Sequence, residues 1–372
     1  MGPQKLELSK TKIYPPLWGT LFLFGLPLTL GLLSWETTPI EARDFPGEIR
    51  TFGAMHTKVE LQIPTNSGSQ ESPQTLAELA TAVILEADTL FSPSGETSDL
   101  RRINEAQVGQ IVTINPLTSL LIQEALLWSQ KSRGFFDPTI GPLKKLYQFD
   151  GNTLKSWPAP QTLQKTLETV GITNLEFDFT RNQIVWKKKG VLDVGGIAKG
   201  FTADLVAQVL VSKGVQNALI NLGGEMRALG NDPSSPNGNW IIDIDDPSGG
   251  QAQYQMEVTN KAIASSGNYN RYFEYQGKRY SHILNPKTGK PLEDYVQGVT
   301  VVLPDSATTA DVLATLLSIL GPTGTEEFLT SLGKTEFPQG VEVVMFLKEA
   351  DGLNKTLYFS LDSEGNLKIT NP

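Results

Sequence analysis

A carboxylate and a hydroxyl stand four residues apart in an apolar segment near the C-terminus, at Asp311 and Thr315. In a helix this spacing places both side chains on one face, one turn apart. Hard oxygen ligands of this kind suit Mg²⁺, which usually keeps several waters and binds substrate phosphates. The alternative is a helix whose threonine bonds its own backbone and whose aspartate faces water. The pair by itself does not decide between the two.

The composition narrows the metal chemistry further. The chain of 372 residues has no cysteine, and its two histidines are His56 and His282. Thiolate zinc sites, iron–sulfur clusters, cysteine nucleophiles and disulfides are therefore excluded, and so is an imidazole-rich metal site. Any metal ion must be held mainly by oxygen.

Two glycine-rich segments could bring the backbone close to a ligand, at residues 192–200 (LDVGGIAKG) and 221–227 (NLGGEMR). Glycines at a strand-to-helix turn let N–H groups approach a phosphate. Lys199 could meet that phosphate, and Asp193 could accept hydrogen bonds from a ribose or a base. A capped tight turn is the better local explanation of the first segment, and a simple turn explains the second equally well.

His282 stands just before a predicted turn at residues 286–289, and it follows the segment 264–268 (ASSGN) and Arg271. At such a place a side chain can reach a cleft, where a histidine can accept a proton or contact a ligand. A purely structural histidine explains the position equally well.

The segments that must position these groups show two different patterns of apolar residues. Apolar residues recur at helical spacing in some segments and alternate with polar ones in others. The patterns predict helices over 76–91, 116–133, 161–171, 197–214 and 306–320, the last ending at Gly321-Pro322. They predict strands over 58–63, 183–187, 218–222, 240–244 and 298–303. Loops are predicted over 64–73, 151–160 and 231–239. Because no regular βαβ repeat is present, the sequence predicts an α+β (mixed α/β) fold.

The N-terminal residues 1–35 have the pattern of an export signal. Lysines at positions 5, 10 and 12 precede an apolar stretch over 17–35, and acidic residues follow it. This arrangement predicts a signal peptide or a signal anchor with its N-terminus inside, followed by a linker over 36–50. The absence of a small-x-small cleavage site favours the anchor, and a buried core helix is the alternative. The rest of the chain is then expected at the outer face of the bacterial cytoplasmic membrane or in the periplasm.

Charge disfavours a nucleic-acid partner. The net charge is −9, and no long run of lysine or arginine occurs. Binding a phosphate backbone requires clustered positive charge, so no nucleic-acid partner is predicted.

Seven segments, in this order, resemble the ApbE family, the FAD:protein FMN transferases. They are residues 52–55, 134–143, 193–200, 221–225, 265–267, 282–289 and 310–315. The resemblance implies a single catalytic domain over 51–372, with mixed, largely antiparallel sheets packed by helices. It also implies Mg²⁺-dependent transfer of the FMN half of FAD to a threonine or serine hydroxyl of an acceptor protein, with release of AMP.

The resemblance also assigns roles to residues. It implies that His282 or Asp311 accepts the hydroxyl proton, and that Mg²⁺ is held by Asp311, Thr315 and a backbone carbonyl at about Gly196. The implied FAD contacts are Met55, Phe136, Asp137, Asp193, Lys199, Ser266 and Ile283.

Two features qualify these assignments. The family usually has Gly-Thr after the first methionine, and this chain has His56-Thr57 instead, which puts the detailed flavin geometry in doubt. Residues 305–310 (DSATTA) loosely resemble the acceptor motif, but a helix start is the better interpretation, so self-flavinylation is not predicted. Two other functions stay open, an FAD pyrophosphatase giving FMN and AMP and a non-catalytic flavin-binding or trafficking protein.

The N-terminal pattern gives a testable prediction about topology. A reporter that is active only outside the cytoplasm should be active when it is fused after Arg50, because the lysine-rich flank is retained inside. The measurement is reporter activity in whole cells. Activity from a reporter that works only in the cytoplasm would overturn the prediction.

Overall fold

The computed structural model describes residues 45–147, 156–245, 247, 254–267, 272–349 and 351–371. The predicted signal at 1–35 lies outside these residues, as do residues 151–155 of the predicted loop 151–160 and the positions Asn268 and Arg271. The first strand, β1, begins at Gly47, inside the range predicted as a linker. None of the helices in the described ranges is both long and apolar enough to cross a membrane.

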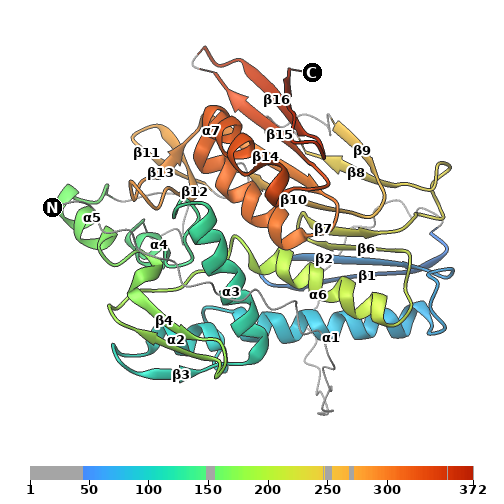
Figure 1. Cartoon of the computed structure of the whole chain (residues 1–372), viewed down its shortest axis with the longest axis horizontal. Helices are drawn as coiled ribbons and strands as arrows, with labels where there is room; N and C mark the ends of the chain where they lie inside the picture. Colours follow the sequence, from blue (N-terminus) through green and yellow to red (C-terminus); the bar gives the residue numbers. More distant parts are fainter. Residues whose placement is uncertain are drawn as a thin grey trace. The chain divides into compact units, whose positions relative to one another are not determined.

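A sheet of nine described strands is the centre of the fold, and each neighbouring pair in it is antiparallel (Figure 1). In order across the sheet the strands are β1 (Gly47–Ala54), β2 (Thr57–Pro64), β6 (Ala218–Leu222), β7 (Glu225–Leu229), β10 (Lys261–Gly267), β14 (Val296–Leu303), β15 (Val341–Lys348), β16 (Asn354–Leu361) and β17 (Leu367–Thr370).

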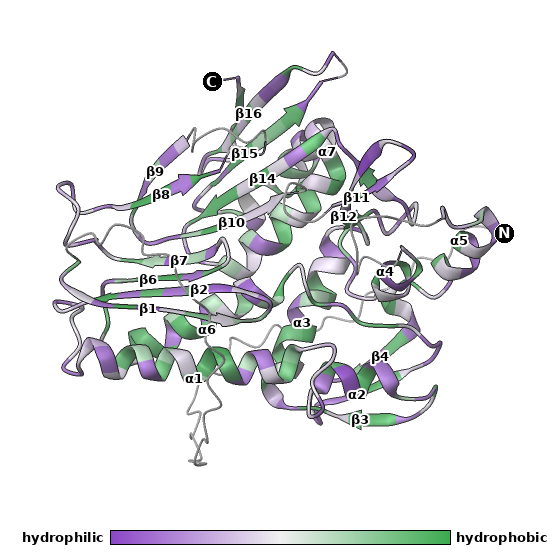
Figure 2. Cartoon of the chain, turned by 180° about the vertical axis from the view of Figure 1, so that it is seen from behind, coloured by the Kyte–Doolittle hydropathy of each residue, from purple (hydrophilic) through white to green (hydrophobic). Residues whose placement is uncertain are grey.

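Three helices, α1 (Pro73–Phe91), α6 (Ala198–Ser212) and α7 (Ala307–Glu336), pack on this sheet. Side chains along β6 point alternately to the two faces of the sheet, and both faces are buried there. Ile220 joins the core formed with α1 and α6, whereas Leu219 packs on the other face with Trp240. Trp240 belongs to the hairpin of β8 (Trp240–Ile244) and β9 (Tyr254–Val258). Helix α1 shows hydrophobic and hydrophilic stretches along its length in Figure 2, as expected of a helix with one buried side.

Smaller units complete the fold. One holds β3 (Ile111–Thr113), β4 (Leu175–Asp178), β5 (Gln183–Trp186), α2 (Asp99–Glu105), α3 (Pro116–Lys131) and the 3₁₀ turn Ile172–Asn174. Another holds β11 (Tyr272–Tyr275), β12 (Lys278–Leu284), β13 (Pro291–Glu293), α4 (Gly141–Tyr147) and α5 (Pro160–Leu167). The described strands pair antiparallel within these sheets too, so the predicted mixed fold with largely antiparallel sheets is confirmed.

The predicted end of the last helix at Gly321-Pro322 is wrong, because α7 continues to Glu336. Gly321 adopts a φ of +66°, which glycine tolerates without steric cost. Pro322 then stands at the start of the next turns, where its missing N–H is least harmful. In the first half of α7, Leu313, Leu316 and Leu317 are fully buried and Leu320 is partly buried.

Helices α6 and α7 touch at Gly200. A Cβ at this position would lie 2.2 Å from the carbonyl oxygen of Ala307 and 2.8 Å from Cβ of Asp311. Real Cβ atoms do not approach other atoms so closely, so the crossing requires glycine.

Replacing Gly200 should therefore separate the two helices. We expect Gly200→Ala to lower the free energy of unfolding by about 1–3 kcal/mol, the usual cost of overpacking, although alanine is the better helix former. Denaturant unfolding measures this change. The matched control is Gly53→Ala, where an added Cβ meets nothing within 4 Å. Equal stability of the two variants would contradict the close crossing.

Candidate functional site

The described residues form a cleft of about 610 Å³ that gathers segments far apart in the sequence. Strands β2, β7, β10 and β12, the start of α6 and the first turns of α7 all contribute to its walls. The predicted site residues that line it are Phe136, Asp137, Asp193, Gly196, Lys199, Ser266, His282, Ile283, Asp311 and Thr315. The structure therefore brings together groups that the sequence could place only on separate elements.

Asp311 is 2% exposed and lies against the start of α6. Its Oδ2 accepts a hydrogen bond of 3.0 Å from the N–H of Gly200, which stands in the first turn of α6 and has no carbonyl partner within that helix. Burial raises the pKa of Asp311, while the nearby Lys199 and the Gly200 N–H act in the opposite direction. The carboxylate is thus held at a helix N-terminus, where negative charge is favoured.

Thr315 stands one turn after Asp311 and faces the glycine segment. Its Oγ1 is 3.4 Å from Oγ of Ser266. A Cβ on Gly196 would lie only 3.1 Å from the same oxygen, so the backbone of Gly196 approaches the threonine closely. The predicted oxygen set of Asp311, Thr315 and Gly196 is therefore assembled around one corner of the cleft.

This corner suits a cation held by mixed oxygen ligands. Within the described ranges, no three His, Cys, Asp or Glu side chains gather in a way that could hold a metal ion. A buried carboxylate, a hydroxyl and a carbonyl leave positions that water and substrate phosphates fill around Mg²⁺. The residues present fit such an ion.

Lys199 forms an ion pair with Glu225, which is 3% exposed. The other carboxylate oxygen, Oε2, has no hydrogen-bond partner among the described residues. Burial raises the pKa of Glu225 to about 7, an effect that Lys199 opposes and Asp311 reinforces. Sequence reasoning assigned Lys199 to the ligand but gave Glu225 no role, although Glu225 directly follows the paired glycines of a matched segment.

Asp193 is paired with Lys144, a lysine that the sequence did not single out. Lys144 Nζ donates to Oδ1 of Asp193 at 2.8 Å, and the Gly195 N–H donates to the same oxygen at 2.9 Å. Burial works to raise the pKa of Asp193, but Lys144, the Gly195 N–H and His282 together lower it. Lys144 immediately follows the matched segment 134–143, and this proximity was the available signal.

Asp137 and Phe136 also line the cleft. Asp137 Oδ1 accepts the N–H and the hydroxyl of Thr139 at 2.8 and 2.6 Å, which fixes the turn. Burial raises the pKa of Asp137, against these bonds and Lys287. Phe136 is largely in the core, with one ring atom 3.3 Å from the position of a Cβ on Gly196.

His282 and Ile283 reach the cleft from the end of β12. Ile283 is buried, whereas His282 is half-buried. The predicted turn that follows is confirmed, because the side chain of Asn285 accepts the N–H of Lys287 at 2.9 Å.

Met55 is the predicted site residue that does not line the cleft. It occupies the two-residue turn between β1 and β2 together with His56, and both residues have positive φ values of 51° and 58°. Such a turn matches the twist of a hairpin, and it packs Met55 against the core while His56 is exposed. Thr57 lines the cleft instead, in the space that Gly223 leaves by having no Cβ.

Known proteins resemble this chain in sequence and in fold. Residues 55–338 match the ApbE family. The chain belongs to the ApbE family. The FAD:protein FMN transferase of Haemophilus influenzae is 33% identical over 249 residues, which are 64% of this chain and 71% of that protein. The FAD:protein FMN transferase of Vibrio cholerae is 33% identical over 275 residues, 73% of this chain and 78% of that protein.

Solved ApbE structures share the fold. The ApbE protein of Thermotoga maritima superposes with a TM-score of 0.72 at 28% identity and covers 82% of this chain and 96% of that one. The flavin transferase ApbE of Vibrio cholerae gives a TM-score of 0.71 at 28% identity and covers 85% of this chain and 97% of that one. The mixed antiparallel architecture of this ApbE protein is therefore that of its family.

The buried carboxyl of Glu225 predicts a pH-dependent stability. Its pKa is 4.5 ordinarily and about 7 in the folded protein. The folded state therefore keeps a proton that the unfolded chain releases, so this contribution is complete below pH 4.5 and is lost as the pH rises to about 7. It amounts to at most about 3 kcal/mol.

Glu225→Gln should remove this loss of stability with rising pH. The measurement is the free energy of unfolding from urea titrations in EDTA at several pH values. Glu326→Gln at an exposed position of α7 keeps Glu225 and should follow the wild-type curve. Parallel curves for Glu225→Gln and wild type would show that Glu225 does not hold the extra proton.

Proposed function

We propose that this protein is an FAD:protein FMN transferase, which moves the FMN half of FAD to a threonine or serine hydroxyl of an acceptor protein and releases AMP. The observation that carries the proposal is the meeting of the family-matched segments at one cleft, with Asp311 and Thr315 beside Gly196 and Lys199. Relatives named FAD:protein FMN transferase match 64% and 73% of the chain.

The charge of the cleft supports a cation requirement. Seven carboxylates and three lysines line it, namely Glu60, Asp137, Asp193, Glu225, Asp243, Asp245 and Asp311 against Lys58, Lys144 and Lys199. A diphosphate brings further negative charge, and phosphoryl transfer requires that charge to be neutralised. Each of these lysines already has a carboxylate partner, Lys58 with Glu60, Lys144 with Asp193 and Lys199 with Glu225, which supports a divalent cation at the diphosphate.

Asp311, Thr315 and the Gly196 carbonyl would hold Mg²⁺. When bound, the ion supplies charge neutralisation and orientation of the diphosphate. The chain's own groups do the rest of the positioning. The turns at Asp193 and Asp137 hold the walls, and the Gly200 N–H at the start of α6 holds Asp311.

In the transfer step the acceptor hydroxyl oxygen forms a bond to the FMN phosphorus, while the bond from that phosphorus to the AMP oxygen breaks. The hydroxyl proton passes to a base, and AMP leaves. His282 and Asp311 are the candidates for this base. Asp311 already accepts the Gly200 N–H and faces Lys199, so we assign the proton to His282, which lines the same cleft and is half-buried.

We further propose that the N-terminal segment exports this protein and holds it at the outer face of the cytoplasmic membrane. The support is the lysine flank before the apolar run over 17–35. The acceptor would then be an exported or membrane-bound protein.

One incubation of the purified protein with FAD and Mg²⁺, with and without an acceptor protein, tests the function. Protein-linked FMN together with AMP supports transfer. Free FMN and AMP in both tubes would instead indicate a pyrophosphatase, and bound but intact FAD would indicate a carrier.

Within this assay, Asp311→Asn should reduce Mg²⁺-dependent transfer by more than the ~100-fold that is typical for loss of an outer partner of a metal ligand. The change keeps the shape and removes the charge. Thr315→Ala should raise the Mg²⁺ concentration needed for half-maximal rate. The matched control is Asp232→Asn, which alters a buried aspartate outside the cleft and should transfer normally. Wild-type metal dependence in Asp311→Asn would mean that the ion binds elsewhere.

A further inference from the structure

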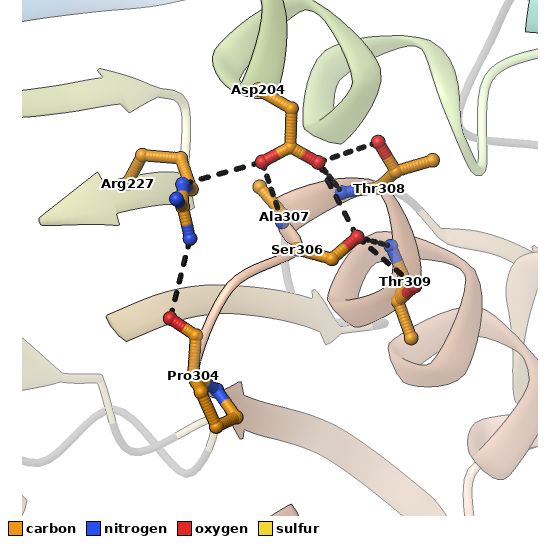
Figure 3. Close-up of polar contacts among 7 residues, drawn as sticks. All are labelled: Asp204, Arg227, Pro304, Ser306, Ala307, Thr308 and Thr309. Atoms are coloured by element: carbon orange, nitrogen blue, oxygen red, sulfur yellow. Dashed lines mark hydrogen bonds and ion pairs between the residues drawn. The ribbon is translucent and has the colours of Figure 1, made fainter. Parts of the chain in front are cut away.

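Asp204 of α6 caps the N-terminus of α7 from outside that helix (Figure 3). The N–H of Ala307 donates to its Oδ1 at 2.9 Å, and the N–H of Thr308 donates to its Oδ2 at 2.9 Å. The hydroxyl of Thr308 donates to Oδ2 as well, at 2.7 Å. Asp204 itself does not line the cleft.

Ser306 satisfies the next donor, because the Thr309 N–H donates to its Oγ at 3.0 Å. The Ala310 N–H donates to the Ser306 carbonyl at 3.0 Å, which is the first hydrogen bond of the helix itself. A helix start leaves N–H groups without partners in the helix. Here Asp204 and Ser306 bind the N–H groups of Ala307, Thr308 and Thr309, so this helix end has one preferred position relative to α6.

Arg227 of β7 ties a third element to the same point. Its Nε lies 3.3 Å from Oδ1 of Asp204, and its NH1 donates to the carbonyl of Pro304, just before α7, at 3.3 Å. Both side chains are mostly buried, which limits screening by solvent. Asp204 therefore joins α6, β7 and the chain that enters α7.

The same three elements carry three of the charged groups of the cleft. Lys199 stands on α6, Glu225 begins β7, and Asp311 stands on α7. The capping is also reciprocal, since Asp311 of α7 accepts the Gly200 N–H in the first turn of α6. Each helix thus places an aspartate at the beginning of the other.

From this geometry we infer that Asp204 is a positioning residue for the transfer reaction, which holds Asp311 and Thr315 in place against Gly196 and Lys199. The inference rests on the proposed function and adds a residue to it that touches neither substrate nor metal. A shift of α7 by about 1 Å is enough to matter, because displacements of that size can cost ~10²-fold in rate.

The test compares Asp204→Asn with Asp99→Asn. Asp99 is also a buried capping aspartate. It accepts the N–H of Asn115 at 2.6 Å and the hydroxyl of Thr118 at 2.7 Å at the start of α3. Helix α3 contributes no residue to the cleft lining. Both variants lose one capping carboxylate, so a purely structural role predicts the same behaviour for both.

Four quantities are measured for wild type and both variants. They are the urea midpoint, the affinity for Mn²⁺ in the absence of FAD by electron paramagnetic resonance, and kcat and KM for FAD in the transfer assay. We expect both variants to lose stability. Asp204→Asn alone should bind Mn²⁺ about tenfold more weakly and lower kcat, with KM for FAD changed less than about twofold.

Wild-type Mn²⁺ affinity and kcat in a folded Asp204→Asn protein would overturn the inference and leave the proposed function standing. If the wild type binds Mn²⁺ but transfers no FMN, the proposed function fails, and the Mn²⁺ comparison still decides the positioning role. A wild type that binds no Mn²⁺ overturns both. Should Asp204→Asn not fold, Thr308→Val removes one hydrogen bond to Asp204 and should show the same selective loss to a smaller degree.

Discussion

The close crossing of α6 and α7 at Gly200 is the contact on which the site depends. Without a Cβ at this position, the two helices approach until the backbone of one meets the side chain of the other. The approach lets the Gly200 N–H reach Asp311, and it lets Asp204 reach the first N–H groups of α7. Both bonds join a carboxylate to a helix N-terminus, where the orphan donors and the helix dipole favour it. Asp311 and Thr315 are held beside the glycine segment as a result.

Burial of charge is the second feature of the cleft. Glu225 and Asp311 are both withdrawn from water beside Lys199, and burial raises the pKa of each carboxyl. Burying several charges is unfavourable unless each has a partner. Lys199 and the Gly200 N–H provide part of that compensation. The cation proposed above would provide more, and it would let a cleft with buried carboxylates accept an anionic diphosphate.

The sheet explains how distant segments share this site. β2, β6, β7 and β10 are neighbours in the sheet, although residues of α1 to α6 separate β2 from β6 in the chain. The smaller units make further contacts with the segments around the cleft. Asn104, at the end of α2, exchanges two hydrogen bonds with the backbone of Leu192, at 2.7 and 2.9 Å, and so secures the chain just before Asp193. The walls of the cleft therefore depend on packing well outside it.

Local pattern in the sequence was sufficient for much of this protein. The four-residue spacing of Asp311 and Thr315, the buried leucines beside them, the main strands and the family-matched segments could all be identified, because periodicity reports which face of an element is buried. The same reasoning predicted an oxygen-rich metal site from the lack of cysteine and the scarcity of histidine.

Only the tertiary structure decided which distant groups meet. Lys144 belongs to the site because it pairs with Asp193, 49 positions away. Glu225 belongs to it because it pairs with Lys199, 26 positions away. Met55 does not line the cleft, because a hairpin turn directs its side chain into the core. The role of Asp204 at a helix that begins 103 positions later is equally invisible in a local pattern. Periodicity specifies how an element buries its own face, whereas hydrogen bonds and ion pairs between elements depend on how those faces pack together.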